Sequence, residues 1–446
     1  MNRISNLARA LFVVGLVLTI TRCQKEETQV TGKDISGMSH NLATEWYALS
    51  LDLVDRTNGY TEPIAARALS YIAFTLYEAS APGIGNKSQQ VILDGLNTTL
   101  PQPVTGKEYN YAIVTNEAMA TMVKYLFGAS GDENLARVEA LRLKFEKQFS
   151  VNSAKVVLSD SKELGRKIGV EITKYSDTDQ QTYAYLENQP GSYVVPVGPG
   201  KWIPTPPDYI EKPLLPTWGN VRSVIFDNSK LRSNKRLEYS ASENSPMYAE
   251  AFVSYNLNNN LTESQKLTVD FWNKSKNPLA GPVCRTMFLS LDLITTDELN
   301  FGAAVEVLVR LSWTLHDGCV LAWKNKYEYS TLRPSSYIKS HINRFFIPEA
   351  SASPTPDYIS ENAVIYKAAA EIFATFFGRS KEFTDRTQQS RVDLIQKSKV
   401  YSNFETWAKE GAYIDVYTGA HFRTSIDAGY EIGYDLSQSI LNIKFK

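Results

Sequence analysis

Apolar residues recur at helical spacing along most of this 446-residue chain. After a polar stretch that ends near residue 38, the pattern begins with Trp46, Leu49 and Leu53 and resumes over residues 65–79. The same periodicity predicts helices over 107–128, 131–149, 160–176, 245–257 and 262–274. Strand signals are sparse, so we expect an almost entirely α-helical fold, in a single domain over residues 39–446.

The clearest predicted helix lies in the C-terminal part of the chain. Thr295 and Glu298 have the spacing of a capping box, so a helix is predicted to start there. Its apolar stripe leads to Trp323 and consists of Ala304, Leu308, Leu311, Leu315, Cys319 and Ala322. Two more helices are predicted, one from Ser360 through Phe377 and one from near Thr418 through Ile440. Residues 295–446 are the expected core, which also carries the polar motifs described below.

One long segment has no helical pattern. Residues 183–222 are too rich in Pro and Gly for a helix or a central strand, and too long for an ordinary connection. Such a segment is either a linker or an ordered loop that covers the core. Its large aromatic side chains favour an irregular covering loop, and they are Tyr193, Trp202, Tyr209 and Trp218.

The N-terminus has the pattern of an export signal. Basic residues precede the apolar run from Ala10 to Ile20, which is too short to span a membrane. We interpret residues 1–22 as a lipoprotein signal peptide, Cys23 as the lipidated residue and 23–38 as a tether, although Arg22 replaces the usual small residue. Residues 24–27 resemble the tag of surface lipoproteins in Bacteroides-like bacteria, so an outer-membrane, surface-exposed location is expected. Simple secretion is the alternative.

Composition, net charge and cysteine spacing limit the partners and sites that we expect. The chain is 43% apolar and 21% charged, which is ample material for a large core. Its formal net charge of −1 argues against a nucleic-acid partner bound through a basic surface. No later segment has eighteen uninterrupted apolar residues, so membrane contact is expected through the N-terminal lipid alone. Cys284 and Cys319 have no spacing typical of a disulfide framework or zinc site, so we expect buried thiols.

A short motif after the long helix suggests a family. Lys326 is followed, after six residues, by Arg333 and Pro334. This spacing resembles the first motif of the superfamily of type 2 phosphatidic acid phosphatases, bacterial acid phosphatases and vanadium-dependent haloperoxidases. Residues 62–80, 198–207, 216–222 and 322–338 are similar to the haloperoxidase-like branch. The resemblance implies a helical bundle of the acid phosphatase and haloperoxidase type, and Lys326 and Arg333 as ligands of phosphate or of a vanadate cofactor.

The second motif of that superfamily, Pro-Ser-Gly-His, corresponds here to residues 359–362. The resemblance implies that Ser360 binds the anion. Glu361 replaces the Gly, and Asn362 replaces the His that acts as the acid. An amide can form hydrogen bonds but cannot transfer a proton, so general acid catalysis would be lost at this position.

The third motif has an Arg six residues before a His that attacks phosphorus or binds vanadium. His421 matches that His, but Asp415 stands in place of the Arg. Asp415 and Glu361 are both disruptive replacements, because each puts a carboxylate where an oxyanion should bind. We expect them to be available to neutralise Lys326 and Arg333.

Three functions remain open. The favoured interpretation is a pseudoenzyme or binding module for a phosphate-like or other small molecule. The alternative is an active phosphomonoesterase in which His421 forms a phosphohistidine. A vanadate haloperoxidase is the least favoured, because vanadate needs the positive cluster that Asp415 and Glu361 oppose. Without the resemblance, His421 is explained as a buried hydrogen-bonded side chain and Ser360 as a helix N-cap.

Overall fold

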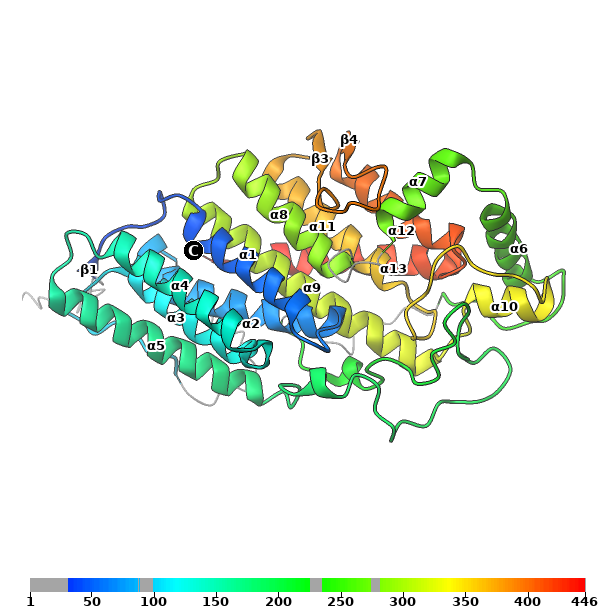
Figure 1. Cartoon of the computed structure of the whole chain (residues 1–446), viewed down its shortest axis with the longest axis horizontal. Helices are drawn as coiled ribbons and strands as arrows, with labels where there is room; N and C mark the ends of the chain where they lie inside the picture. Colours follow the sequence, from blue (N-terminus) through cyan, green and yellow to red (C-terminus); the bar gives the residue numbers. More distant parts are fainter. Residues whose placement is uncertain (1–30, 87, 89–98, 225–234, 274–280, 446) are drawn as a thin grey trace, which may run out of the picture.

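A computed structural model describes residues 31–86, 88, 99–224, 235–273 and 281–445 (Figure 1). Within these residues the chain forms thirteen α-helices. The first seven are α1 (Asn41–Arg56), α2 (Glu62–Ser80), α3 (Tyr111–Leu126), α4 (Asp132–Phe149), α5 (Lys155–Asp177), α6 (Pro246–Asn259) and α7 (Glu263–Trp272). The others are α8 (Pro282–Thr296), α9 (Phe301–Tyr329), α10 (Pro334–His341), α11 (Glu361–Phe377), α12 (Phe404–Tyr417) and α13 (Arg423–Leu441). The fold is helical, as the periodicity predicted.

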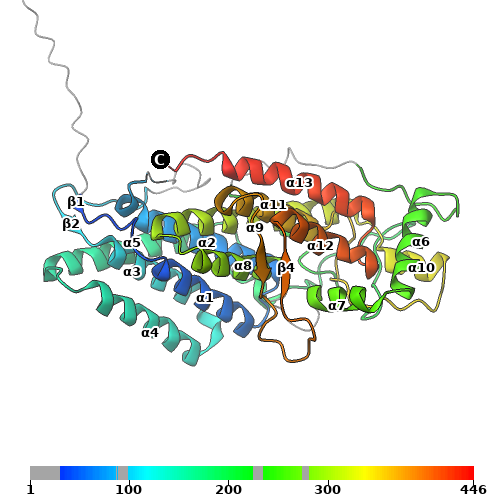
Figure 2. The ribbon, with the colours of Figure 1, turned by 90° about the horizontal axis from the view of Figure 1, so that it is seen from above.

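The strands among the described residues are few and short. β1 (Thr31–Gly32) pairs in parallel with β2 (Glu108–Tyr109), and β3 (Phe383–Asp385) pairs antiparallel with β4 (Lys399–Tyr401). The helices form an elongated body, with α3, α4 and α5 at one end and α6 and α10 at the other (Figures 1 and 2). The long helix α9 runs between these two ends.

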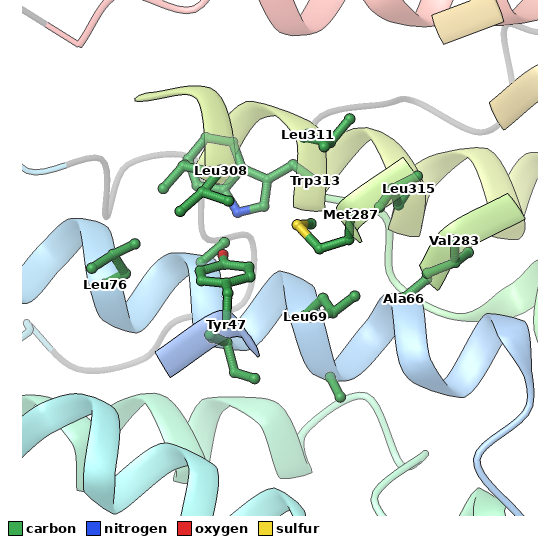
Figure 3. Close-up of a cluster of buried hydrophobic side chains, with 14 of the residues drawn as sticks. Tyr47, Ala66, Leu69, Leu76, Val283, Met287, Leu308, Leu311, Trp313 and Leu315 are labelled. Carbon is green, nitrogen blue, oxygen red and sulfur yellow. The ribbon is translucent and has the colours of Figure 1, made fainter. Parts of the chain in front are cut away.

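The core around α9 explains why that helix is buried. α2 packs against α9, and α1 and α8 also contact it. Figure 3 shows Leu69 and Leu76 of α2 in one buried hydrophobic cluster with α9 side chains that include Leu308 and Leu311. Fully burying one such Leu side chain stabilises the fold by roughly 1.5–3 kcal/mol. The core therefore holds the C-terminal end of α9, where the first motif begins, in a fixed place.

A second close contact fixes the helix that carries the second motif. α11 packs against α9, α12 and α13. At Gly429 of α13 a Cβ would lie 2.6 Å from the Ser360 carbonyl oxygen, and at Gly433 one would lie 2.4 Å from the Val364 carbonyl oxygen. The α13 and α11 backbones therefore touch, which positions the start of α11.

The segment over 183–222 is the covering loop that its composition predicted. Apart from two short 3-10 turns, it has no regular structure. The Trp202 amide donates to the Ser330 carbonyl (2.8 Å), just after α9, and the Trp202 and Trp218 side chains are buried. The Tyr193 ring meets the edge of Tyr327 of α9, whereas Tyr209 is exposed. The loop thus packs over the end of α9 next to the first motif.

Two predicted helix starts are wrong. Thr295 and Glu298 do not open a helix: Thr295 lies in the last turn of α8, and its hydroxyl donates to the Leu291 carbonyl. Asn300 caps α9 instead, because its side chain accepts the Ala303 amide (2.9 Å). The last helix begins at Arg423, five residues later than expected, since α12 and a turn occupy the preceding residues.

The cysteines of the helical body are buried thiols. Cys284 and Cys319 are both buried and form no disulfide with each other, as predicted. None of the helices in the described residues is long and apolar enough to cross a bilayer. The signal peptide, Cys23 and the first half of the tether (residues 23–30) lie outside the described residues.

The contact between α13 and α11 makes a prediction for Gly433→Ala. In a helix, Ala is favoured over Gly by about 1 kcal/mol, but here the new methyl would meet a backbone oxygen. Overpacking typically costs about 1–3 kcal/mol, so we expect a net loss in the free energy of unfolding, measured by urea denaturation. The matched control is Gly302→Ala in α9, whose Cβ would lie no closer than 3.4 Å to any neighbour. If both variants are equally stable, the close contact is absent.

Candidate functional site

The three motifs meet where four helix ends come together. Lys326 lies in the last turn of α9 and Arg333 is the N-cap residue of α10. Glu361 and Asn362 open α11, and His421 lies in the turn between α12 and α13. The structure therefore brings these sequence-predicted residues into one site.

Lys326 and Glu361 form a buried ion pair. Lys326 Nζ lies 2.9 Å from Glu361 Oε2, and the two side chains are 0% and 4% exposed. The ammonium also donates to the carbonyl oxygens of Pro356 (2.9 Å) and Asp357 (3.2 Å). Removing two charges from water costs several kcal/mol each, so such a pair is stable only when its remaining hydrogen bonds are satisfied. Here the carbonyl groups of Pro356 and Asp357 accept the remaining hydrogen bonds of the Lys326 ammonium.

Arg333 is held by neutral acceptors. Its Nε donates to the Thr355 carbonyl (2.7 Å), Nη2 to the Thr355 hydroxyl (2.8 Å) and Nη1 to the Ala420 carbonyl (2.6 Å). Nη1 also lies 3.3 Å from His421 Nε2. The guanidinium is thus fixed by the backbone on both sides of the site.

His421 lies between two carboxylates. Its Nδ1 is 2.8 Å from Asp357 Oδ1, and its Nε2 is 3.2 Å from Glu361 Oε2. Asp357 is itself held by the Phe422 amide (3.2 Å) and the Ser425 hydroxyl. Nε2 of His421, the residue that the resemblance assigns to attack on phosphorus or to vanadium binding, therefore faces the carboxylate of Glu361.

Asp357 is a site residue that the sequence did not single out. It lies in the Pro-rich turn before α11, three residues ahead of Ser360, and none of the three motifs includes it. The sequence could have suggested it, because Asp357 is an acidic residue in the turn directly before the second motif. It orients the imidazole, as carboxylates often do for site histidines.

The remaining predicted positions serve local structure. The Ser360 hydroxyl accepts the Ala363 amide (3.3 Å) as the N-cap of α11. Asn362 Nδ2 donates to Asp415 Oδ2 (2.9 Å). The residue in place of the family's acid His is therefore hydrogen-bonded to the residue in place of its Arg. Asp415 belongs to the last turn of α12, and its carbonyl accepts the Ala420 amide (3.0 Å).

Two cavities adjoin Glu361. The first, called the small cavity, is about 40 Å³ and is lined by polar residues that include Arg333, Glu361, Asn362, Asp415 and His421, beside Trp272 and Tyr366. The second, called the acidic cavity, is about 500 Å³. Its lining includes four carboxylates and, among the described residues, no Lys or Arg; the carboxylates belong to Asp55, Glu62, Asp208 and Glu361. Residues 351–353 and Glu361 line both cavities.

The other histidines do not replace the missing acid. His316 is buried in α9, its Nε2 contacts the Arg222 carbonyl (2.9 Å), and burial lowers its pKa to about 4. His341 contacts the Tyr239 hydroxyl (3.1 Å). Neither lines the two cavities. In the part of the chain that the structure describes, no three His, Cys, Asp or Glu side chains are placed to hold a metal ion.

The site thus brings together a Lys, an Arg and a His at the ends of helices in a helical bundle. Residues 343–444 match the family model described as the VCPO second helical-bundle domain. No curated protein matches the sequence significantly. The chain therefore contains a helical domain of the vanadium haloperoxidase type.

Solved structures support the same conclusion over almost the whole chain. A bacterial vanadium-dependent iodoperoxidase, described as the first of its kind, superposes with a TM-score of 0.77 and 25% identity, covering 92% of this chain and 97% of that one. Apo and holo structures of a bacterial vanadium-dependent chloroperoxidase superpose with TM-scores of 0.65 and 0.59, each at 12% identity. They cover 91% of this chain in both cases, and 98% and 94% of their own.

The residues present do not fit a vanadate group. Glu361 Oε2 lies within 3.2 Å of both Lys326 Nζ and His421 Nε2, so a carboxylate holds the atoms that would receive the oxyanion. A second carboxylate, Asp415, lines the same small cavity. Like charges at such distances repel strongly in a buried site, so this arrangement of side chains opposes the binding of vanadate.

The Lys326 ammonium predicts a pH dependence of stability. Burial lowers its pKa from 10.5 to about 8, although Glu361 acts in the opposite direction. Between pH 8 and 10.5 the unfolded chain therefore binds more protons than the folded chain, so this group's contribution to stability rises with pH. We expect the contribution of Lys326 to the free energy of unfolding to increase by about 1–3 kcal/mol across this pH range.

The measurement is urea denaturation at several pH values, compared with the double variant Lys326→Met/Glu361→Gln. Subtracting the two curves removes the contribution of the tyrosines, which also titrate at high pH. The free energy of unfolding of the native chain minus that of the double variant should rise from about pH 8 to about pH 10. A difference that falls with pH would show that the ion pair, rather than burial, dominates the pKa of Lys326.

Proposed function

We propose that this protein is a non-catalytic protein with the vanadium haloperoxidase fold, in which Glu361 takes the place of the bound oxyanion, and that it acts as a small-molecule binding module. One observation carries the proposal: Glu361 Oε2 lies 2.9 Å from Lys326 Nζ and 3.2 Å from His421 Nε2. A carboxylate attached to the chain contacts the cation and the imidazole without the entropy loss of binding a free anion.

The surroundings of the site support the same proposal. Asn362 cannot donate a proton to a leaving group, and neither His316 nor His341 lines the cavities. The acidic cavity next to the site adds Asp55, Glu62 and Asp208. A cavity lined by charges of one sign lowers the local concentration of ions of that sign. Oxyanions are therefore disfavoured both on approach and at the site.

Replacing Glu361 provides the test. We expect no calorimetric binding of orthovanadate or phosphate to the full-length chain at about millimolar anion. In Glu361→Gly, which removes one charge and opens space, phosphate should bind at least about tenfold more tightly, since the Lys326 ammonium then lacks its carboxylate partner. Phosphate should also raise the melting temperature of this variant and not that of the native chain.

The matched control is Glu361→Gln, which removes the charge but keeps the volume. It should bind phosphate more weakly than Glu361→Gly because the amide still fills the site. Micromolar binding of orthovanadate to the native chain would overturn the proposal.

A second function is favoured by one specific observation. Asp357 orients His421 so that Nε2 points to the same place as Lys326 and Arg333, which is the arrangement of a nucleophilic His. The phosphomonoesterase alternative thus requires Glu361 to leave the site. Turnover of para-nitrophenyl phosphate that is lost in both His421→Ala and Arg333→Ala would establish it.

We further propose, from the N-terminal sequence, that the chain is exported and anchored through a lipid on Cys23. Expressed in a Gram-negative host with its own N-terminus, the native protein should partition into the detergent phase of a detergent–water separation. Cys23→Ala should move it to the aqueous phase, because the proposed lipid then has no thiol to which it can be attached. The control Cys284→Ala removes a buried thiol and should leave partitioning unchanged.

A further inference from the structure

Asn362 leaves a hydrogen-bond acceptor unused at the small cavity. Its side chain lines that cavity and the residue is 8% exposed. Oδ1 is buried and has no hydrogen-bond partner. A buried polar atom without a partner costs about 1–3 kcal/mol, so such an atom points to a donor supplied from elsewhere.

The orientation of this amide follows from its neighbour. Asn362 Nδ2 donates to Asp415 Oδ2 at 2.9 Å. Turning the amide over would place Oδ1 against the carboxylate, with two acceptors facing each other. The acceptor of Asn362 is therefore directed away from Asp415.

The charges around this acceptor favour a cation. Among the described residues, the lining of the small cavity has two carboxylates, Glu361 and Asp415, and one guanidinium, Arg333. Because Glu361 is already paired with Lys326, Asp415 is the carboxylate that would face a bound cation. Hydrogen bonds from Arg333 go to Thr355, Ala420 and His421, so much of its donor capacity is already used. The N-terminus of α11 carries a partial positive charge, which Glu361 at its first position offsets. The neighbouring acidic cavity extends the negative field.

We propose that the small cavity binds the ammonium head of a small organic amine, which donates a hydrogen bond to Asn362 Oδ1 beside the Asp415 carboxylate. The proposal deepens the proposed function and rests on it, because the site must not hold an oxyanion. The cavity of about 40 Å³ suits a head group of this size. Trp272 and Tyr366 in its lining provide apolar surface for the carbon atoms of the amine.

The test compares three probes of similar size by calorimetry at about pH 7 on the full-length chain: propylammonium, 1-propanol and acetate. We expect propylammonium to bind at least about tenfold more tightly than 1-propanol, and acetate not to bind. Equal binding of 1-propanol would overturn the proposal in favour of a neutral polar ligand. Binding of acetate as tight as that of propylammonium, or no binding of any probe, would also overturn it.

Two variants assign the contacts. Asn362→Leu keeps nearly the same volume and removes the acceptor, and Asp415→Asn removes the charge, so each should weaken propylammonium binding at least about tenfold. The matched control Asp435→Asn changes an exposed acid on α13 and should leave binding unchanged. Unchanged binding in both cavity variants would place the amine elsewhere.

An orthovanadate titration of the same sample separates this inference from the proposed function. If neither orthovanadate nor propylammonium binds, the amine site is wrong and the non-catalytic proposal stands. If orthovanadate binds at micromolar concentration, the proposed function is wrong, and the amine site fails with it.

Discussion

The buried pair of Lys326 and Glu361 is the interaction on which the rest of the site depends. An ammonium that is fully buried at the end of α9 must face an anion, and the fold provides one at the first residue of α11. Removing one partner of such a pair typically costs about 3–5 kcal/mol, because the other charge stays buried. The carboxylate therefore contributes to the stability of the fold as well as to the charge of the site. Losing it without a replacement anion would be strongly destabilising.

The packing that places this pair is independent of its chemistry. α9 is held by the apolar core with α2, and α11 is held by the backbone contact at Gly429 and Gly433 of α13. Neither contact uses a polar side chain of the site. A fold can therefore keep its architecture while the residues at its helix ends change, and function must be argued from those residues rather than from the fold. The likeness to vanadium-dependent peroxidases extends to the architecture, whereas Glu361 and Asp415 depart from what an oxyanion requires.

Much of the fold could be predicted from the sequence because helical periodicity reflects burial directly. The error at Thr295 has a local cause: Glu298 has a positive φ of 50°, so the chain turns sharply there, and Asn300 offers a stronger cap two residues later. The motifs singled out Lys326, Arg333 and His421, which the structure places around Glu361 and one another. Their partners were harder to predict, because Arg333 is held largely by backbone carbonyl groups and every residue type carries a carbonyl. Asp357 was missed for a similar reason, since only the folded turn places it beside His421.

The replacements at positions 362 and 415 have a combined effect that neither would have alone. An Arg at 415 would contribute donors and a positive charge, and a His at 362 could transfer a proton. Asp415 instead accepts the amide hydrogen of Asn362, which directs the amide oxygen away from the carboxylate. Together with Glu361, these two residues turn a site that should present donors to an anion into one that presents acceptors. Because the polarity of a buried site is set by such groups collectively, Asn362→His alone would leave both carboxylates, Glu361 and Asp415, in the cavity lining. In the proposed function these three positions therefore act as a unit, while the packing of the helices that carry them does not depend on them.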